Sequence, residues 1–271
     1  MRCDICIDPP KKQKCDTCNC ETCANASRCH RRIRPTIRVT KKCSQSCSHC
    51  CFSCSPKSEE MMSVATAQTI AKFLVANDIK SINLMGGEVW LNPDWKEIIT
   101  LFSCVDRIRV VSNSDFMVLC PEFLPFLSQL DNVKLCLSND KWHTNKHVSA
   151  AEKEANRLDI NCEVSGKSGD ALKEDGIVPV GRMRWGANNM FDMFMAYCQK
   201  PENKYSILID ENGEIYKCCF ERFAFDNVED YLEEKSFNAR FKQFGTAFHN
   251  MWISNCLACD RLHSRYLELS A

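Results

Sequence analysis

Short apolar runs alternate with longer segments of helical periodicity from residue 36 to about residue 190. The runs with strand-like composition cover residues 36–40, 81–85, 107–111, 133–137, 160–164 and 177–180. Apolar residues at helical spacing cover residues 63–76, 93–102, 122–130 and 147–158, and Ser63 is placed to cap the first of these helices. Strands that alternate with helices predict β-α units around a parallel sheet. Because six units fit this length better than eight, we expect an α/β fold of the partial (β/α)6, TIM-like barrel type.

The pattern changes at both ends of this region. Residues 206–210 and 215–218 predict a β-hairpin around a turn at 211–214, and residues 228–244 predict a helix. Residues 1–35 contain seven cysteines but almost no apolar residues that could form a core. We therefore expect three parts: a cysteine-rich, metal-binding extension at 1–35, the partial barrel at 36–190, and a small domain with a hairpin and a helix at 191–271.

Charge and length exclude several classes of protein. The chain carries 35 basic and 35 acidic side chains, so no overall field attracts nucleic acid or an anionic membrane. No apolar run is long enough to span a membrane, and the N-terminus has no signal-peptide core. We expect a cytoplasmic protein with no membrane partner and no clear nucleic-acid partner. In that reducing compartment, 21 cysteines indicate metal ligation or thiol chemistry rather than disulfides.

Cys43, Cys47 and Cys50 follow the first predicted strand at a C-x3-C-x2-C spacing. A cubane iron–sulfur cluster normally has four cysteine ligands, so three leave one iron open to a molecule that is not protein. That arrangement suits a cluster that does chemistry on a bound small molecule. The alternatives are zinc or buried structural thiols. Cys51 and Cys54 could serve as alternative ligands, but we interpret them as accessory residues.

Polar or glycine residues follow the other predicted strands as well. They are Gly86, Gly87 and Glu88 after the second strand, Asn113 within 112–115 after the third, Ser138 within 138–140 after the fourth, and Arg182 after the last. Because the carboxyl ends of parallel strands meet at one rim, we expect these residues to form one site together with the three cysteines. For Asp140 and His143, a solvated loop and a capping histidine are the preferred interpretation over catalysis.

Two C-x2-C pairs near the N-terminus predict a further metal site. Cys3 pairs with Cys6, and Cys15 pairs with Cys18. Paired C-x2-C motifs are typical of zinc sites, although the spacer between these pairs is short. A third iron–sulfur cluster and a disordered segment are the alternatives.

The three-cysteine motif resembles that of the radical S-adenosylmethionine (radical SAM) superfamily, with His49 at the position that is usually aromatic. Gly86-Gly87-Glu88-Val89 resembles the Gly-Gly-Glu-Pro element of that family, with valine in place of proline. The resemblance implies that Cys43, Cys47 and Cys50 hold a 4Fe-4S cluster and that S-adenosylmethionine (AdoMet) occupies its open iron. It further implies cofactor contacts for a set of rim residues: Gly86, Gly87, Glu88, Asn113, Ser138 and Arg182.

The C-terminal region resembles the twitch domain of the same superfamily, a shortened SPASM domain. The residues that match its pattern are Cys198, Gly213, Cys218, Cys256 and Cys259. The resemblance implies that the four cysteines hold a second, auxiliary 4Fe-4S cluster without an open iron. Structural zinc is the alternative, and Cys219 could replace Cys218.

The resemblance implies an enzyme that reductively cleaves AdoMet to a 5′-deoxyadenosyl radical, which takes a hydrogen atom from a substrate. The auxiliary cluster would accept an electron, and a reductant such as flavodoxin or ferredoxin would supply the first one. We expect a peptide or protein substrate, as in the maturation of ribosomal peptides. The alternatives are oxidation of a small-molecule alcohol and, in another class, a cysteine-rich metal-binding or electron-transfer module without catalysis.

Overall fold

A computed structural model describes residues 34–48, 50–140, 142–165, 206–216, 224, 226–234 and 236–237 of the chain. The chain divides into two compact units, Met1–Ile33 and Arg34–Ala271, and all described residues belong to the second unit. The predicted strand at 177–180 and residues 235 and 238–244 of the predicted helix at 228–244 lie outside the described residues.

The described strands form one mixed sheet in the order β5-β4-β3-β2-β1-β6-β7-β8. Six neighbouring strands are parallel: β1 (Arg34–Arg38), β2 (Ser81–Met85), β3 (Arg107–Ser112), β4 (Val133–Leu137), β5 (Asn161–Val164) and β6 (Ser206–Ile209). Two short antiparallel strands, β7 (Glu214–Tyr216) and β8 (Asp226–Asn227), follow β6 at the edge. The prediction of an α/β fold with an open parallel sheet of the partial-barrel type is confirmed.

Helices connect the parallel strands in the predicted places. They are α2 (Val64–Ala76), α3 (Trp95–Phe102), α4 (Phe116–Leu119), α5 (Phe123–Leu127) and α6 (Val148–Arg157), with 3-10 turns η1 (Val89–Leu91) and η5 (Val228–Tyr231). The Ser63 side chain accepts a hydrogen bond from the Thr66 backbone at 3.1 Å, which confirms the predicted cap of α2. Among the described residues, no helix combines the length and the apolar composition that crossing a membrane requires.

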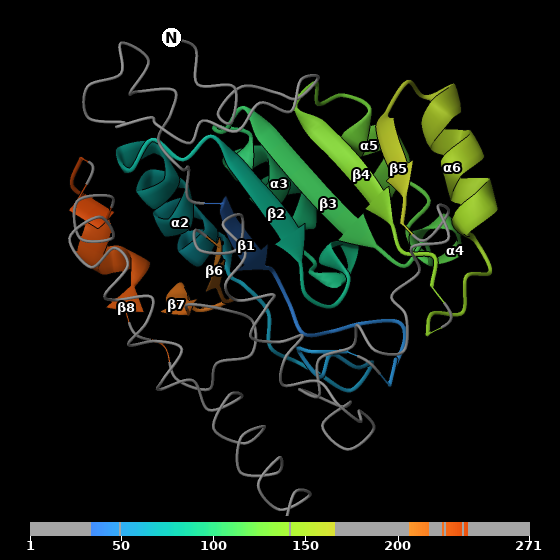
Figure 1. Ribbon diagram of the computed structural model, residues 1–271, viewed down its shortest axis with the longest axis horizontal. Helices are drawn as coiled ribbons and strands as arrows, with labels where there is room; N and C mark the ends of the chain where they lie inside the picture. The colour runs from blue at the N-terminus through green and yellow to red at the C-terminus, as the bar shows by residue number, and fades with distance from the viewer. Residues whose placement is uncertain are drawn as a thin grey trace, which may run out of the picture. The chain divides into compact units, whose positions relative to one another are not determined.

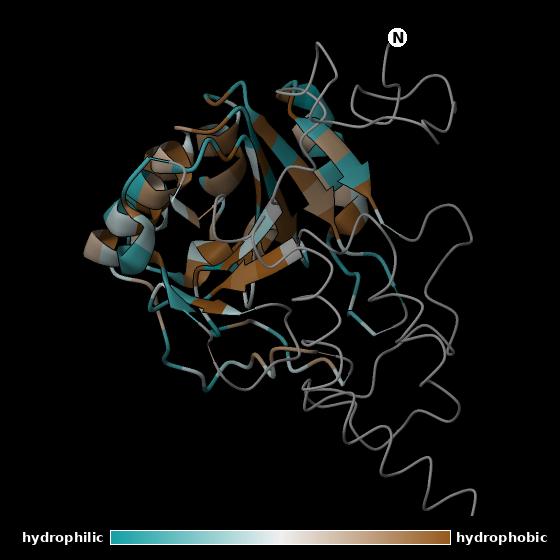
Figure 2. Cartoon of the chain, turned by 60° about the vertical axis from the view of Figure 1, so that its left-hand side comes forward, coloured by the Kyte–Doolittle hydropathy of each residue, from teal (hydrophilic) through white to brown (hydrophobic). Residues whose placement is uncertain are grey.

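The two faces of the sheet differ in character. On one face Ile82, Leu84, Ile108, Val110 and Leu135 are buried in the core, and Figure 1 shows α2 and α3 behind the strands. On the opposite face, one cross-strand row is polar from β1 to β5 and reaches the buried Leu208 on β6; its polar residues are Thr36, Asn83, Arg109, Lys134 and Asn161. Figure 2 shows hydrophilic bands between hydrophobic bands along the strands. The second face therefore offers polar groups next to apolar side chains such as Met85, Val111 and Cys136.

The β6–β7 hairpin continues the barrel sheet. It was predicted as part of a separate C-terminal domain, but β6 pairs in parallel with β1 over Arg34–Ile37. Gly213 forms its turn with a φ of +81°, a conformation that favours glycine. The hairpin therefore lies beside the strand that leads into the three-cysteine motif.

The predicted helix at 228–244 does not begin as an α-helix. Asn227 and Asp230 form a capping box around the 3-10 turn η5, which ends at Tyr231. The Asn77 side chain then donates to the Tyr231 carbonyl oxygen at 2.8 Å and accepts from the Phe237 backbone at 2.9 Å. Asn77, at the end of α2, thus holds both Tyr231 and Phe237 in place. The residue pattern within 228–244 does not predict these contacts.

Candidate functional site at the carboxyl edge of the sheet

The segment from Cys43 to Ser55, which we call the cysteine loop, directly follows β1. Its two ends are joined, because the Cys43 backbone donates to the Ser55 carbonyl oxygen at 3.1 Å and the Ser55 backbone donates to the Lys41 carbonyl oxygen at 3.2 Å. The Cys50 backbone donates to the Cys47 carbonyl oxygen at 3.2 Å, which forms a turn between these two cysteines. A short closed loop therefore carries all three predicted ligands, each with a half-buried side chain.

The three thiols lie close enough to influence one another. Burial, together with the negative neighbours Glu88, Cys47 and Cys50, raises the pKa of Cys43 to about 12. In the described part of the chain, no three His, Cys, Asp or Glu side chains converge in the way that a single metal ion requires. A cubane cluster distributes its thiolate ligands over separate irons, so they need not converge on one point. The donor set thus fits a cluster with an open iron better than a structural zinc ion.

Cys54 is buried beside the predicted ligands. It packs with Phe52 and Leu208, and Cys43, Cys50 and Cys51 contact this apolar cluster. The Cys54 backbone donates to Cys50 Sγ at 3.3 Å. A side-chain hydrogen bond with Cys50 and burial raise the pKa of Cys54. In this structure Cys54 thus packs against the cysteine loop from the protein interior. The accessory role of Cys51 and Cys54 stays a prediction.

Gly86 and Gly87 allow two backbone segments to meet. The Gly87 backbone donates to the Thr40 carbonyl oxygen at 2.7 Å, and the Glu88 backbone donates to the Lys42 carbonyl oxygen at 2.9 Å. A Cβ on Gly87 would lie 1.8 Å from the Lys42 carbonyl oxygen, and one on Gly86 would lie 2.6 Å from that of Thr40. The two glycines therefore let the chain after β2 approach the backbone of residues 40–42, which leads from β1 into the cysteine loop. Their contact with a cofactor stays a prediction.

Glu88 connects the ends of β2 and β3. Its buried carboxylate accepts hydrogen bonds from Trp90 Nε1 at 2.8 Å, Ser112 Oγ at 2.5 Å and the Asn113 backbone at 2.9 Å. Burial raises the pKa of Glu88 to about 7, although all three donors favour the ionised form. These protein groups occupy much of the carboxylate's acceptor capacity, so a contact with a cofactor amine stays a prediction.

Asn113 touches the cysteine loop directly. Its side-chain nitrogen donates to Ser44 Oγ at 2.9 Å and lies 3.9 Å from Cys43 Sγ. Ser138 is held beside it, because the Ser138 backbone donates to the Ser112 carbonyl oxygen at 2.8 Å. The structure therefore brings the ends of β2 and β3 to the cysteine loop and places Ser138 beside the end of β3, while Thr144, after β4, contacts the loop through Gln45.

Asp140 bonds to residues 142, 143 and 145, which follow β4. The Asp140 carboxylate accepts from the Trp142 and His143 backbones at 2.9 and 3.2 Å and lies 2.9 Å from His143 Nδ1. Burial lowers the pKa of His143, but hydrogen bonds and charges from Asp140 and Cys47 outweigh burial and raise this pKa to about 10. His143 is half-buried beside the cysteine loop and does not cap α6, whose N-cap is His147. His143 is therefore not a cap of α6, whereas Thr144 and Lys146 are exposed, so the interpretation as a solvated loop stays a prediction.

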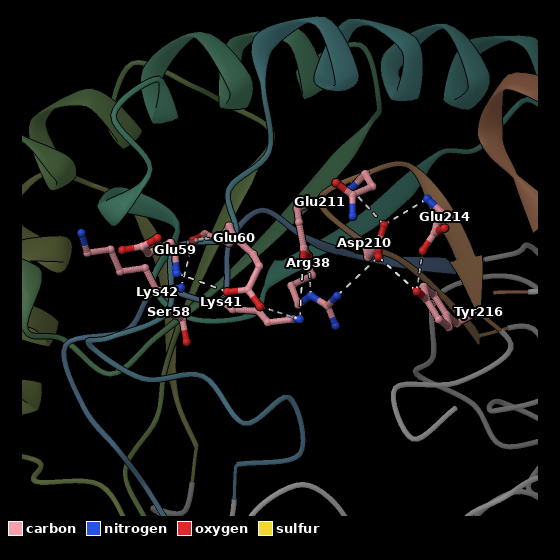
Figure 3. A network of polar contacts seen from close by, with 12 residues as sticks. Arg38, Lys41, Lys42, Ser58, Glu59, Glu60, Asp210, Glu211, Glu214 and Tyr216 are labelled. Carbon is pink, nitrogen blue, oxygen red and sulfur yellow. Dashed lines mark hydrogen bonds and ion pairs between the residues drawn. The ribbon is translucent and has the colours of Figure 1, made fainter. Parts of the chain in front are cut away.

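Arg38, the last residue of β1, connects the site to the β6–β7 hairpin (Figure 3). Its guanidinium donates to Glu211 Oε2 at 2.7 Å, lies 3.5 Å from Asp210 Oδ2 and sits over the Phe52 ring at 5.5 Å from its centre. Asp210 also accepts from the Asn212 and Glu214 backbones. The side chains of Arg38, Asp210 and Glu211 are at most 10% exposed, so these charges depend on one another.

We expect Arg38→Met to lower the free energy of unfolding by about 3–5 kcal/mol, because it leaves the buried Asp210 without its cation and Glu211 with only Lys41, at 3.8 Å. Urea unfolding followed by circular dichroism measures the loss. The control is Arg157→Met, an exposed arginine on α6 that pairs with Glu154, and we expect it to cost far less, because an exposed ion pair contributes little. Equal losses in the two variants would contradict the importance of burial in this network.

The remaining predicted site residues lie outside the described residues. They are Cys3, Cys6, Cys15, Cys18, Arg182, Cys198, Cys218, Cys219, Cys256 and Cys259. Sequence reasoning missed four residues that build the site: Arg38, Ser44, Gln45 and Thr144. Ser44 and Gln45 carried a local signal, because both are polar residues inside the three-cysteine motif. Ser112 and Asp115 lie in the predicted stretch 112–115, although the sequence assigned them no individual role.

Comparison with known proteins relates the chain to solved structures. No family model and no curated protein matches the sequence. The structure is similar to that of BtrN in complex with AdoMet and 2-DOIA, with a TM-score of 0.56 and 17% identity over 79% of this chain and 85% of that one. It is also similar to Streptococcus suis SuiB bound to S-adenosylmethionine, with a TM-score of 0.57 and 10% identity over 84% of this chain and 71% of that one.

Two further neighbours contain peptides. SuiB bound to the precursor peptide SuiA matches with a TM-score of 0.55 and 12% identity over 78% of this chain, which spans 64% of that SuiB chain. The enzyme anSMEcpe with bound AdoMet and Cp18Cys peptide matches with a TM-score of 0.50 and 14% identity over 78% of this chain and 82% of that one. These neighbours are radical SAM enzymes, and at such low identity the likeness establishes that this chain has their fold.

Proposed function

We propose that this protein is a radical SAM enzyme that oxidatively modifies a peptide or protein. The observation that carries the proposal is the cysteine loop. It presents Cys43, Cys47 and Cys50 on one closed segment at the carboxyl edge of the sheet, in a fold shared with structures that contain AdoMet. Three thiols match a 4Fe-4S cluster that keeps one iron for a small molecule.

The cluster and AdoMet, when bound, would supply an electron and a 5′-deoxyadenosyl radical that takes a hydrogen atom from the substrate. The chain's own residues bind and orient. The three cysteines hold the cluster, and Gly86, Gly87, Glu88, Asn113, Ser138 and Arg182 contact AdoMet. The face of the sheet with the polar row, next to the cysteine loop, receives the substrate. Flavodoxin or ferredoxin is the proposed reductant.

Cys198, Cys218, Cys256 and Cys259 are the proposed ligands of an auxiliary 4Fe-4S cluster that accepts an electron from the substrate, and Cys3, Cys6, Cys15 and Cys18 are those of a zinc ion or a third cluster. A peptide substrate is supported by two neighbours that contain peptides, SuiB with SuiA and anSMEcpe with Cp18Cys. Oxidation of a small alcohol is the second candidate, since BtrN was solved with 2-DOIA.

The test uses the full chain, reconstituted anaerobically with iron and sulfide. We expect that dithionite and AdoMet together give 5′-deoxyadenosine and methionine, detected by mass spectrometry, and that omission of either reagent gives none. The competing hypothesis, a metal-binding or electron-transfer module without catalysis, predicts no 5′-deoxyadenosine under any of these conditions. Absence of the product from a preparation with full iron occupancy would overturn the proposal.

A further inference from the structure

Gln45 is a buried polar residue between the first two cysteines of the cysteine loop, with 8% of its surface exposed. Its side-chain nitrogen donates to Asp115 Oδ2 at 3.0 Å and to Thr144 Oγ1 at 2.9 Å. Its side-chain oxygen accepts from the Thr144 backbone at 3.2 Å and from the Cys47 thiol at 3.5 Å. The side-chain nitrogen of Gln45 thus makes two donor bonds and its oxygen accepts two. Such complete hydrogen bonding is expected of a buried glutamine.

The partners fix the orientation of this amide. A backbone N–H can only donate and a carboxylate can only accept, so the oxygen of Gln45 must face Thr144 N and its nitrogen must face Asp115. Asp115 belongs to the end of β3, since its backbone donates to Asn113 Oδ1 at 3.0 Å. Thr144 belongs to the segment after β4 that bonds to Asp140.

Gln45 contacts residues that are far from it in the sequence. Gln45 joins the cysteine loop to residues 70 and 99 positions away. Ser44 adds two side-chain bonds to the end of β3, because it donates to the same Asp115 carboxylate at 2.7 Å and accepts from Asn113 Nδ2 at 2.9 Å. The conformation of the loop between two predicted cluster ligands therefore depends on a clamp formed by Gln45, Asp115 and Thr144.

We propose that Gln45 is a positioning residue that holds Cys43 and Cys47 at the spacing the cluster requires, by clamping the cysteine loop to the ends of β3 and β4. The inference rests on the proposed function for the nature of the cluster. Gln45 itself touches neither iron nor AdoMet in this role, and it acts through the loop. Residues that orient the ligands of a metal site commonly affect its affinity or activity by about 10- to 100-fold.

The test compares Gln45→Ala with Gln68→Ala, which removes an exposed glutamine on α2. In the metal-free protein we expect Gln45→Ala to speed amide hydrogen exchange at residues 43–48 and 142–146, and Gln68→Ala to leave it unchanged. In the reconstituted protein we expect altered g values in the electron paramagnetic resonance spectrum of the reduced cluster. The rate of 5′-deoxyadenosine formation should fall about tenfold.

An exchange variant separates positioning from general stability. Gln45→Glu with Asp115→Asn swaps amide and carboxylate and keeps the net charge, so a donor again faces an acceptor between positions 45 and 115. We expect it to restore the spectrum and the rate, whereas Gln45→Glu alone sets two carboxylates against each other and does not. If Gln45→Ala fails to fold, the comparison of Gln45→Glu with the exchange variant tests the proposal.

Two results would overturn the inference: a wild-type spectrum and rate in Gln45→Ala, or an exchange variant no better than Gln45→Glu alone. Amide hydrogen exchange is measured in the metal-free protein and does not depend on the cluster. Failure of the proposed function would therefore leave faster exchange in Gln45→Ala intact, while failure of the clamp would leave AdoMet cleavage intact.

Discussion

Replacement of Cys47 by alanine is expected to abolish AdoMet cleavage. The cysteine loop offers three thiolates to a cluster that normally takes four, so the loss of one leaves two ligands and no stable cubane. The effect should far exceed the roughly 10- to 100-fold cost that is typical when an outer partner of a metal ligand is lost. Iron content, the absorbance of the cluster and 5′-deoxyadenosine formation measure it in the same reconstituted sample. Cys43→Ala and Cys50→Ala should behave in the same way.

Cys104→Ala is the matched control, because Cys104 is the exposed cysteine that precedes β3 and lies outside the cysteine loop. We expect it to keep wild-type iron content at the first cluster and wild-type cleavage. Full activity in Cys47→Ala would show that another group has taken its place. Cys51 is the nearest candidate, since it contacts the same apolar cluster as Cys43 and Cys50.

The parts of the fold that could be predicted from the sequence are those with a local signal. β2 and β4 begin and end at the predicted residues, because apolar residues alternate along them and the alternate positions are buried against the helices. The site could be anticipated for a related reason. In parallel α/β proteins the carboxyl ends of the strands share one rim, and Glu88, Asn113 and Ser138 do lie together there.

The contacts that hold the site together have no local signal. Gln45 and Thr144 are 99 residues apart, and Arg38 and Glu211 are 173 residues apart. Arg38 lies in a predicted strand where a charged residue normally indicates solvent, and only the pairing of β6 with β1 brings two carboxylates to it. Sequence periodicity gives the direction of a side chain but not the partner that meets it, which is why both networks appear only in the structure.

Replacement of Gly87 by alanine is expected to lower the free energy of unfolding by about 3–5 kcal/mol, from overpacking against the backbone together with two weakened hydrogen bonds. The added Cβ would lie 1.8 Å from the carbonyl oxygen of Lys42 and 2.4 Å from its carbonyl carbon. Both atoms belong to the backbone, so no side-chain rotation relieves the clash. The bonds from Gly87 to Thr40 and from Glu88 to Lys42 would lengthen as the two segments separate.

Because Lys42 directly precedes Cys43, the same displacement moves the first predicted ligand, and we expect Gly87→Ala to incorporate little iron even under conditions where it remains folded. Gly213→Ala is the control. Its φ of +81° makes alanine unfavourable by about 1–2 kcal/mol, and the nearest atom to the new Cβ is Val228 Cγ2 at 3.0 Å, a side chain that can shift. Gly213→Ala should therefore lose some stability but keep its iron at the cysteine loop. Equal iron content in both variants would show that the fit between Gly87 and Lys42 does not control the loop.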